Sequence, residues 1–181
     1  MVLFLPCSDK IKIILYLCRR KRHKYLLMEQ IQRITVDELY ISPFSSRRVY
    51  SEDGAISWVP VERNLNPTGQ RHLDFIARSM SQGHADLSWI AQQLHCSVAD
   101  LCAMIRVLTG IGGRDFRHEY GFRVVDDLLR YTSMTVGEIA QHTGFHSASS
   151  LCQQYIKYRH ITPDTRRKAI RQERDKGRYR L

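Results

Sequence analysis

Proline, paired cysteines and long apolar runs are scarce in this sequence. The roughly 95 residues between Pro67 and Pro163 contain no proline, which favours helices because proline breaks the hydrogen-bond ladder of a helix interior. The five cysteines are an odd number without a C-x-x-C pair, so we expect neither a disulfide framework nor a zinc ribbon, and a reducing compartment fits best. No apolar run approaches the roughly 20 residues that span a bilayer. A polytopic membrane protein is therefore excluded.

Motifs for catalysis and metal binding are missing as well. The sequence has no G-x-S-x-G, H-E-x-x-H or phosphate-loop motif. His95, Cys96 and Cys102 can ligate a metal, but we prefer to interpret the cysteines as small apolar residues on helix faces. We therefore predict no enzyme activity, no catalytic or metal site and no cofactor.

The charged residues are distributed unevenly. The chain has 28 Lys and Arg against 18 Asp and Glu, a net charge of +10. Its 43% hydrophobic and 25% charged residues are normal for a folded soluble protein. Residues 1–35 and 166–181 each carry +6, residues 36–69 carry −2, and residues 70–165 are neutral. The basic excess favours a polyanionic partner, either nucleic acid or an acidic membrane face.

The first 35 residues combine an apolar run with a basic cluster. Residues 11–18 are mostly apolar and residues 19–24 are basic, an order typical of the cytoplasmic end of a membrane span. One interpretation of residues 1–35 is therefore a membrane-proximal helix that anchors the chain or meets a sensor partner. The other is an amphipathic helix or a poorly structured basic arm.

Turn-forming residues mark a linker before a helical region. Asp53-Gly54 and other Ser, Asn, Pro and Gly residues predict that residues 36–69 are a linker with at most a short strand or hairpin. We place a boundary near Gly69, followed by a domain over residues 70–168. A basic C-terminal tail, helical or frayed, is predicted over residues 169–181.

Apolar residues recur at helical spacing throughout the region after the linker. The apolar faces of six predicted helices run over residues 73–80, 87–94, 101–108, 116–129, 136–143 and 151–158. Asp86 is a candidate N-cap, and the third helix is entered through Ser97 and closed by Gly110. Thr135 and Glu138 match a capping box at the start of the fifth helix.

Two segments of this region repeat one pattern. Ile90-Ala91-Gln92 leads through Ser97 to Leu101-Cys102, and Ile139-Ala140-Gln141 leads through Ser147 to Leu151-Cys152. The offset is 49 residues before the turn and 50 after it. Each copy is a short helix, a turn and a second helix entered through serine, which is the helix-turn-helix layout. A pair of generic helical hairpins would give the same pattern.

Further motifs extend this repeat into a family pattern. The second copy contributes Thr135 to Ala140, Gly144-Phe145, Ser147, Leu151 and Thr162-Pro163 followed by Arg167. The first copy and the middle helix contribute Leu87 to Ala91, Ser97, Leu101, Thr109-Gly110, Phe116 and Leu128-Leu129. With these motifs, residues 72–167 resemble the DNA-binding domain of AraC/XylS-type transcription regulators. The resemblance implies seven helices, with two helix-turn-helix units joined by a long linker helix.

The resemblance also implies which residues meet DNA. A helix in the major groove reads base edges, and two such helices would reach successive groove faces about 34 Å apart. In the second unit the corresponding residues are Ser147, Ser149, Ser150, Gln153 and Lys157. Gln153 is suited to adenine and Lys157 to the backbone, although a solvated polar face would also place these residues outward.

The first unit departs from the family pattern. Its corresponding residues are Ala99, Cys102 and Ala103, and the family often has arginine where Ala103 stands. Arg106 is expected to contact phosphate. Gly113 stands where proline is common. We infer weakened base readout in the first unit.

The basic residues after the second unit are expected to contact DNA without reading its sequence. Arg166 and Arg167 are the main candidates, and Lys168, Arg171 and Arg174 follow them.

The prediction is an all-α fold in which two helix-turn-helix subdomains are joined by a long linker helix, behind a poorly structured basic N-terminal extension. The predicted function is that of a bacterial, cytoplasmic, sequence-specific transcription regulator of the AraC/XylS type, with most base readout in the second unit. Its partners would be the major groove of double-stranded DNA and RNA polymerase. The alternative is a degenerate regulator that acts mainly through protein contacts, or the cytoplasmic end of a membrane-anchored sensor.

Overall fold

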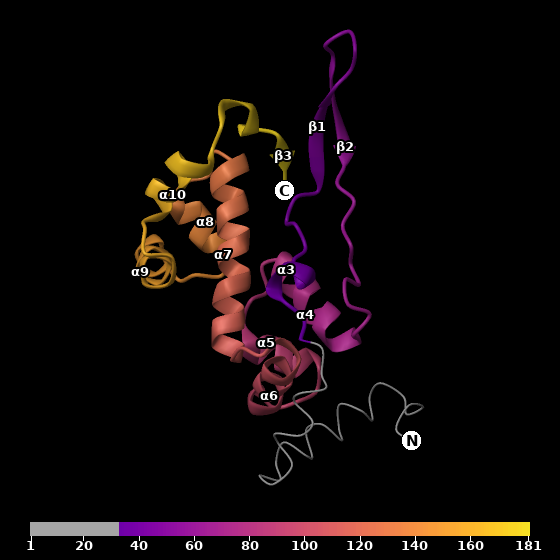
Figure 1. The fold of residues 1–181 in the computed structure, drawn as a ribbon, viewed down its shortest axis with the longest axis vertical. Helices are drawn as coiled ribbons and strands as arrows, with labels where there is room; N and C mark the ends of the chain where they lie inside the picture. The colour runs from indigo at the N-terminus through magenta and orange to yellow at the C-terminus, as the bar shows by residue number, and fades with distance from the viewer. Residues whose placement is uncertain (1–32) are drawn as a thin grey trace.

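The computed structural model describes residues 33–181 as a mostly helical protein with a small sheet (Figure 1). The membrane-proximal helix or basic arm predicted for residues 1–35 lies outside the described residues apart from its last three. The helices are α3 (Val36–Leu39), α4 (Arg71–Ser81), α5 (Leu87–Gln93), α6 (Val98–Thr109), α7 (Gly113–Tyr131), α8 (Val136–His142), α9 (Ala148–Arg159) and α10 (Pro163–Ile170). The strands are β1 (Ser46–Tyr50), β2 (Ile56–Pro60) and β3 (Tyr179–Arg180), and a 3-10 turn, η1 (Glu173–Asp175), precedes β3. In this described part, no helix is both long and apolar enough to cross a membrane.

The helices begin at the polar residues that the sequence marks as caps. Asp86 accepts a hydrogen bond from Ser88 N–H at 3.1 Å, which confirms it as the N-cap of α5. The predicted capping box is also present at α8. The Thr135 hydroxyl accepts from Glu138 N–H at 3.2 Å, and the Glu138 carboxylate accepts from Thr135 N–H at 2.6 Å. These caps satisfy backbone N–H groups that have no partner inside the helix.

α7 is the long central helix around which the others are arranged. It has 19 residues, which corresponds to a length of about 28 Å at 1.5 Å per residue. Figure 1 shows α5 and α6 at its N-terminal end and α8, α9 and α10 along one side. The sheet and α3 lie on the opposite side of α7 from α9. Both helix pairs are therefore held by one helix.

A single hydrophobic core joins the two helix pairs to the segment before them. Leu39, Ile41 and Phe44 are almost fully buried, although the sequence assigned residues 36–69 to a linker. The buried Tyr120 hydroxyl, on α7, accepts from Ile41 N–H at 3.2 Å and donates to the carbonyl oxygen of Ala77, on α4, at 3.0 Å. The residues after Thr35 thus form part of the packed unit, while the domain boundary near Gly69 stays a prediction.

The sheet corrects the prediction of an all-α fold. β1 lies between β2 and β3, and both pairings are antiparallel. The β1–β2 hairpin turns through Asp53-Gly54, where Gly54 takes a φ of 80° that glycine readily adopts. Across this turn, Ser51 N–H donates to the carbonyl oxygen of Ala55 at 3.0 Å.

The residues after α10 fold back onto α7. The Arg171 guanidinium donates to the carbonyl oxygen of Leu129 at 2.7 Å and also to that of Thr132. These carbonyls at the C-terminal end of α7 have no helical partner, and a positive charge is favourable there. Asp175 is fully buried and pairs with Arg130 at 2.9 Å. β3 then pairs with β1, so this basic segment is folded rather than frayed.

Candidate nucleic-acid interface

The turn of the α5–α6 pair passes through a left-handed residue. His95 has a φ of 52°, and the following Cys96 N–H donates to the carbonyl oxygen of Ala91 at 3.0 Å. This is the hydrogen bond of a Schellman motif, which ends a helix sharply. Ser97 then caps α6, because its hydroxyl accepts from Asp100 N–H at 3.1 Å.

The turn of the α8–α9 pair repeats this geometry with glycine. Gly144 has a φ of 74°, and Phe145 N–H donates to the carbonyl oxygen of Ala140 at 2.8 Å. One additional residue, His146, precedes the cap Ser147, whose hydroxyl accepts from Ser150 N–H at 3.1 Å. The extra residue accounts for the change in the repeat offset from 49 to 50.

α9 presents a polar outward face. Ser149, Gln153 and Lys157 are exposed at intervals of four residues, and Ile156 is 44% exposed between them. Ser150 is half-buried and lies beside this face. Among the described residues, neither Ser149 nor Gln153 has a hydrogen-bond partner, so both side chains are available to a ligand. Leu151 and Tyr155 are fully buried on the other side of the helix.

α6 is less polar at two of the three corresponding positions, and it carries an arginine at the third, where α9 has Ile156. Ala99 and Arg106 are exposed and Ala103 is half-buried, at the same intervals of four and three residues as Ser149, Gln153 and Ile156. Figure 1 shows both α6 and α9 nearly end-on, at different levels of α7.

Cys102 lies at the contact between α6 and α7. A Cβ added at Gly113 would lie 2.6 Å from the Cys102 Sγ. A proline ring at residue 113 would therefore collide with the thiol, which gives a structural reason for glycine where the family commonly has proline. The half-buried Cys102 packs against the start of α7, and its place among the DNA-reading positions stays a prediction.

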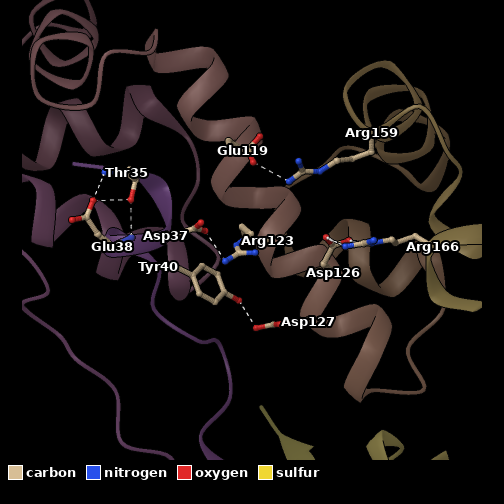
Figure 2. A network of polar contacts seen from close by, with 10 residues as sticks. All are labelled: Thr35, Asp37, Glu38, Tyr40, Glu119, Arg123, Asp126, Asp127, Arg159 and Arg166. Carbon is tan, nitrogen blue, oxygen red and sulfur yellow. Dashed lines mark hydrogen bonds and ion pairs between the residues drawn. The ribbon is translucent and has the colours of Figure 1, made fainter. Parts of the chain in front are cut away.

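Ion pairs and hydrogen bonds fix α9 and α10 against α7 (Figure 2). Arg159 pairs with Glu119 at 3.0 Å, and Arg166 pairs with Asp126 at 3.2 Å. The Tyr155 hydroxyl donates to the same Asp126 carboxylate. Burial, together with this hydrogen bond, raises the pKa of Tyr155 above its ordinary value. Because these contacts hold α9 rigidly, its outward face is presented in one orientation.

Arg166 and Arg167 both have partners within the protein. Besides the pairing of Arg166 with Asp126, the Arg167 guanidinium donates to the carbonyl oxygen of Met134 at 2.6 Å. Both side chains are half-buried. They therefore attach α10 to the rest of the domain, and phosphate contact by either residue stays a prediction.

Two further arginines lie between the helix pairs, at positions that the sequence motifs do not indicate. Arg114 and Arg117 occupy the first turns of α7, three residues apart and hence on one helix face. Their spacing is visible in the sequence, but its significance depends on the packing of α7 between α5 and α9. In residues 33–181, no cluster of three or more His, Cys, Asp or Glu is placed to hold a metal ion.

Comparisons with known proteins agree with this geometry. Residues 90–169 match the family model of a helix-turn-helix domain. The C-terminal domain of AraT, a response regulator from Geobacillus stearothermophilus, is similar with a TM-score of 0.52 and 23% identity, over 61% of this chain and 91% of that chain. This likeness shows a shared fold.

Two other solved structures are also similar. One is the C-terminal domain of the two-component response regulator yesN from Fusobacterium nucleatum, with a TM-score of 0.49 and 25% identity over 55% of this chain and 96% of that chain. The other is a transcriptional regulator from Chromobacterium violaceum described as having an AraC-type DNA-binding domain, with a TM-score of 0.49 and 21% identity over 58% and 96%. No curated protein matches the chain.

The match assigns residues 90–169 to a helix-turn-helix domain. The matching model is one of AraC-type helix-turn-helix domains, so over these residues the match confirms the resemblance drawn from the motifs in the sequence.

Proposed function

We propose that this chain is a sequence-specific DNA-binding transcription regulator in which α5–α6 and α8–α9 are two helix-turn-helix units. α6 and α9 would enter successive major-groove faces, and α7 would set their spacing. RNA polymerase and a membrane or sensor component remain predicted partners, and a cytoplasmic location and the absence of enzyme activity remain predictions.

The observation that supports unequal readout is the difference between the outward faces of α6 and α9. Gln153 has an amide that can form two hydrogen bonds with adenine, and Ser149 can bond to a base or a phosphate. At the equivalent places, Ala99 and Ala103 offer methyl groups only. We therefore assign most base readout to α9.

Selection of binding sites from a random DNA pool tests this assignment. Wild-type protein should enrich one motif, and Gln153→Ala should lose preference at one or two base pairs of it, at a cost of about 1–3 kcal/mol in discrimination. Gln93→Ala, an exposed amide on α5, is the matched control and should leave the motif unchanged.

Gel shifts across salt concentrations separate this function from its alternative. Selective retention of the motif at physiological salt supports the proposed regulator. No retention even at low salt would instead support a degenerate regulator that acts through protein contacts, because nonspecific phosphate contacts are strongest at low salt.

A further inference from the structure

A polar groove lies between the two helix pairs. It consists of two adjoining hollows that share Arg117, Gly144 and His146. One hollow continues along α9 to Lys157, and the other reaches Trp89 on α5 and His84 in the turn before that helix. The start of α7, the turn before α5 and the α8–α9 turn therefore line one continuous surface, which runs from the first pair to the second.

The groove is rigid because the turns on either side of it touch. A Cβ added at Gly83, in the turn before α5, would lie 3.1 Å from the carbonyl oxygen of His142, at the end of α8. A Cβ added at Gly144 would in turn lie 3.7 Å from the carbonyl oxygen of Gly83. Gly83 has a φ of 88° and Gly144 a φ of 74°, so both turns depend on glycine.

The cationic side chains of the groove are not neutralised by ion pairs. Within the described chain, Arg114, Arg117 and Lys157 form none, although Arg123, Arg130, Arg159 and Arg166 each do. Asp115 lines the same hollow, and its carboxylate accepts a hydrogen bond from the Tyr158 hydroxyl at 3.2 Å. Asp86 lies at the α5 end of the groove.

His118 lines the same hollow and lies close enough to this cluster to be affected by its charge. Burial lowers its pKa, and the positive charges of Arg117, Arg114 and Lys157 lower it further, against the opposing effect of Asp115. The cations thus outweigh the nearby carboxylate at that imidazole. A surface with this potential attracts an anion.

We propose that this groove binds phosphate groups of the DNA backbone where the minor groove passes between the two helix pairs. The inference rests on the proposed function, because α6 and α9 in successive major grooves leave the intervening minor groove facing the start of α7. Arg114 and Arg117 supply the guanidinium groups, which match phosphate geometry. His84 and His146 add imidazole donors on either side.

The contact would position the protein without reading sequence, since phosphates carry no base information. It would also compensate for the weak outward face of α6, because it places cations beside the first helix pair. The groove thereby extends the interface beyond the two outward helix faces.

The test compares two charge-matched double variants of the full chain. Arg114→Gln with Arg117→Gln removes two groove cations, and Arg63→Gln with Arg71→Gln removes two exposed cations near the start of α4. Binding is measured on the selected motif and on an unrelated duplex over a range of salt concentrations. Thermal unfolding of each variant shows that it remains folded.

The groove variant should weaken binding to both duplexes by the same factor, about tenfold or more at low salt. Its slope of log affinity against log salt should fall by about 2, at roughly 0.9 for each phosphate that is no longer neutralised. The control variant should change affinity less than about threefold and keep the slope. An unchanged slope in the groove variant, or an equal loss in the control, would overturn the proposal.

Phosphate ethylation interference locates the contact. With wild-type protein, ethylation should interfere at phosphates that flank the minor groove between the two halves of the site. The groove variant should lose only these signals. If the signals remain in the variant, the groove does not make the contact.

The same measurements keep the two proposals distinguishable. Wild-type binding without sequence preference, combined with a reduced slope in the groove variant, would overturn the base readout and support the groove. A selected motif, combined with an unchanged slope in the groove variant, would support the base readout and overturn the groove. If the wild-type chain binds no duplex, both proposals fail.

Discussion

The two helix pairs have the same turn and different outward faces. His95 in the first turn and Gly144 in the second are equivalent left-handed residues, with φ of 52° and 74°. In each turn the N–H of the next residue donates to the carbonyl oxygen five residues before it. On the second helices, however, Ala103 stands where the other pair has Gln153. The turn is set by backbone geometry and buried packing, whereas the outward face contributes little to folding. The second helices can therefore differ in chemistry without any change in the scaffold.

Removing one buried leucine from each pair should give the largest effect. Leu101 and Leu151 are both fully buried in the same core. Leu101→Ala and Leu151→Ala should each lower the free energy of unfolding by about 2–5 kcal/mol, as measured by urea denaturation. Because one core connects the pairs, each variant should unfold in a single transition. Two separate transitions would show that the pairs are independent units.

A polar side chain at Ala103 should make base readout by α6 more similar to base readout by α9. Ala103→Gln should create a preference for adenine, and Ala103→Arg a preference for guanine, within the half of the motif that faces α6. We expect about 1–3 kcal/mol of discrimination, measured by selection from random DNA. If both variants select the wild-type motif, our inference that base readout is weak in the first unit is wrong.

Exchanging residues at the two turns should have a smaller effect. His95→Gly removes a side chain from a left-handed position and should stabilise the protein by about 0.5–1 kcal/mol. Gly144→Ala should destabilise it by about 1–2 kcal/mol through backbone strain alone. The added Cβ would meet Gly83 and Ala85 at ordinary contact distances of 3.7 and 3.8 Å. The two variants should shift the urea denaturation midpoint in opposite directions. If His95→Gly and Gly144→Ala shift it in the same direction, this interpretation of the turns is wrong.

The capping box distinguishes the start of α8 from that of α5 and should give the smallest effect. Hydrogen bonds from the Thr135 backbone and hydroxyl lower the pKa of Glu138 below its ordinary 4.5. A lowered pKa stabilises the folded state above pH 4.5, and this contribution is lost as the pH falls through the folded-state pKa. Glu138→Gln keeps an acceptor oxygen but does not titrate, so its unfolding midpoint should decline less steeply below pH 4.5. Parallel acid profiles would contradict this.

Much of the helical region could be predicted because its signals are local. Asp86, Ser97, Thr135 and Ser147 cap the helices at which the sequence placed them, since a cap depends on residues within one turn. β3 could not be predicted in this way. It has two residues in a basic segment, and it forms only because β1 offers it a distant partner.

The candidate interface is only partly predictable from the sequence, because basic and acidic residues are equal in number over residues 70–165. Residues 70–165 have zero net charge, which gives no sign of an anion-binding surface. In the structure, Glu119, Asp126 and Glu138 serve ion pairs or caps. Arg114 and Arg117 have no such partner among residues 33–181, and they lie together in the groove. Net charge along a sequence does not show where opposite charges are separated in space.

The three-stranded sheet also affects the order of folding. Ser45 donates a hydrogen bond to Arg180 across 135 residues of sequence, whereas each helix pair closes over a few residues. Contacts between such distant segments form slowly, because the long intervening chain loses much conformational entropy when its ends meet. We therefore expect the helix pairs and the local β1–β2 hairpin to be protected early in pulsed hydrogen exchange and the β1–β3 pairing last, so that both helix pairs are in place before the sheet is complete.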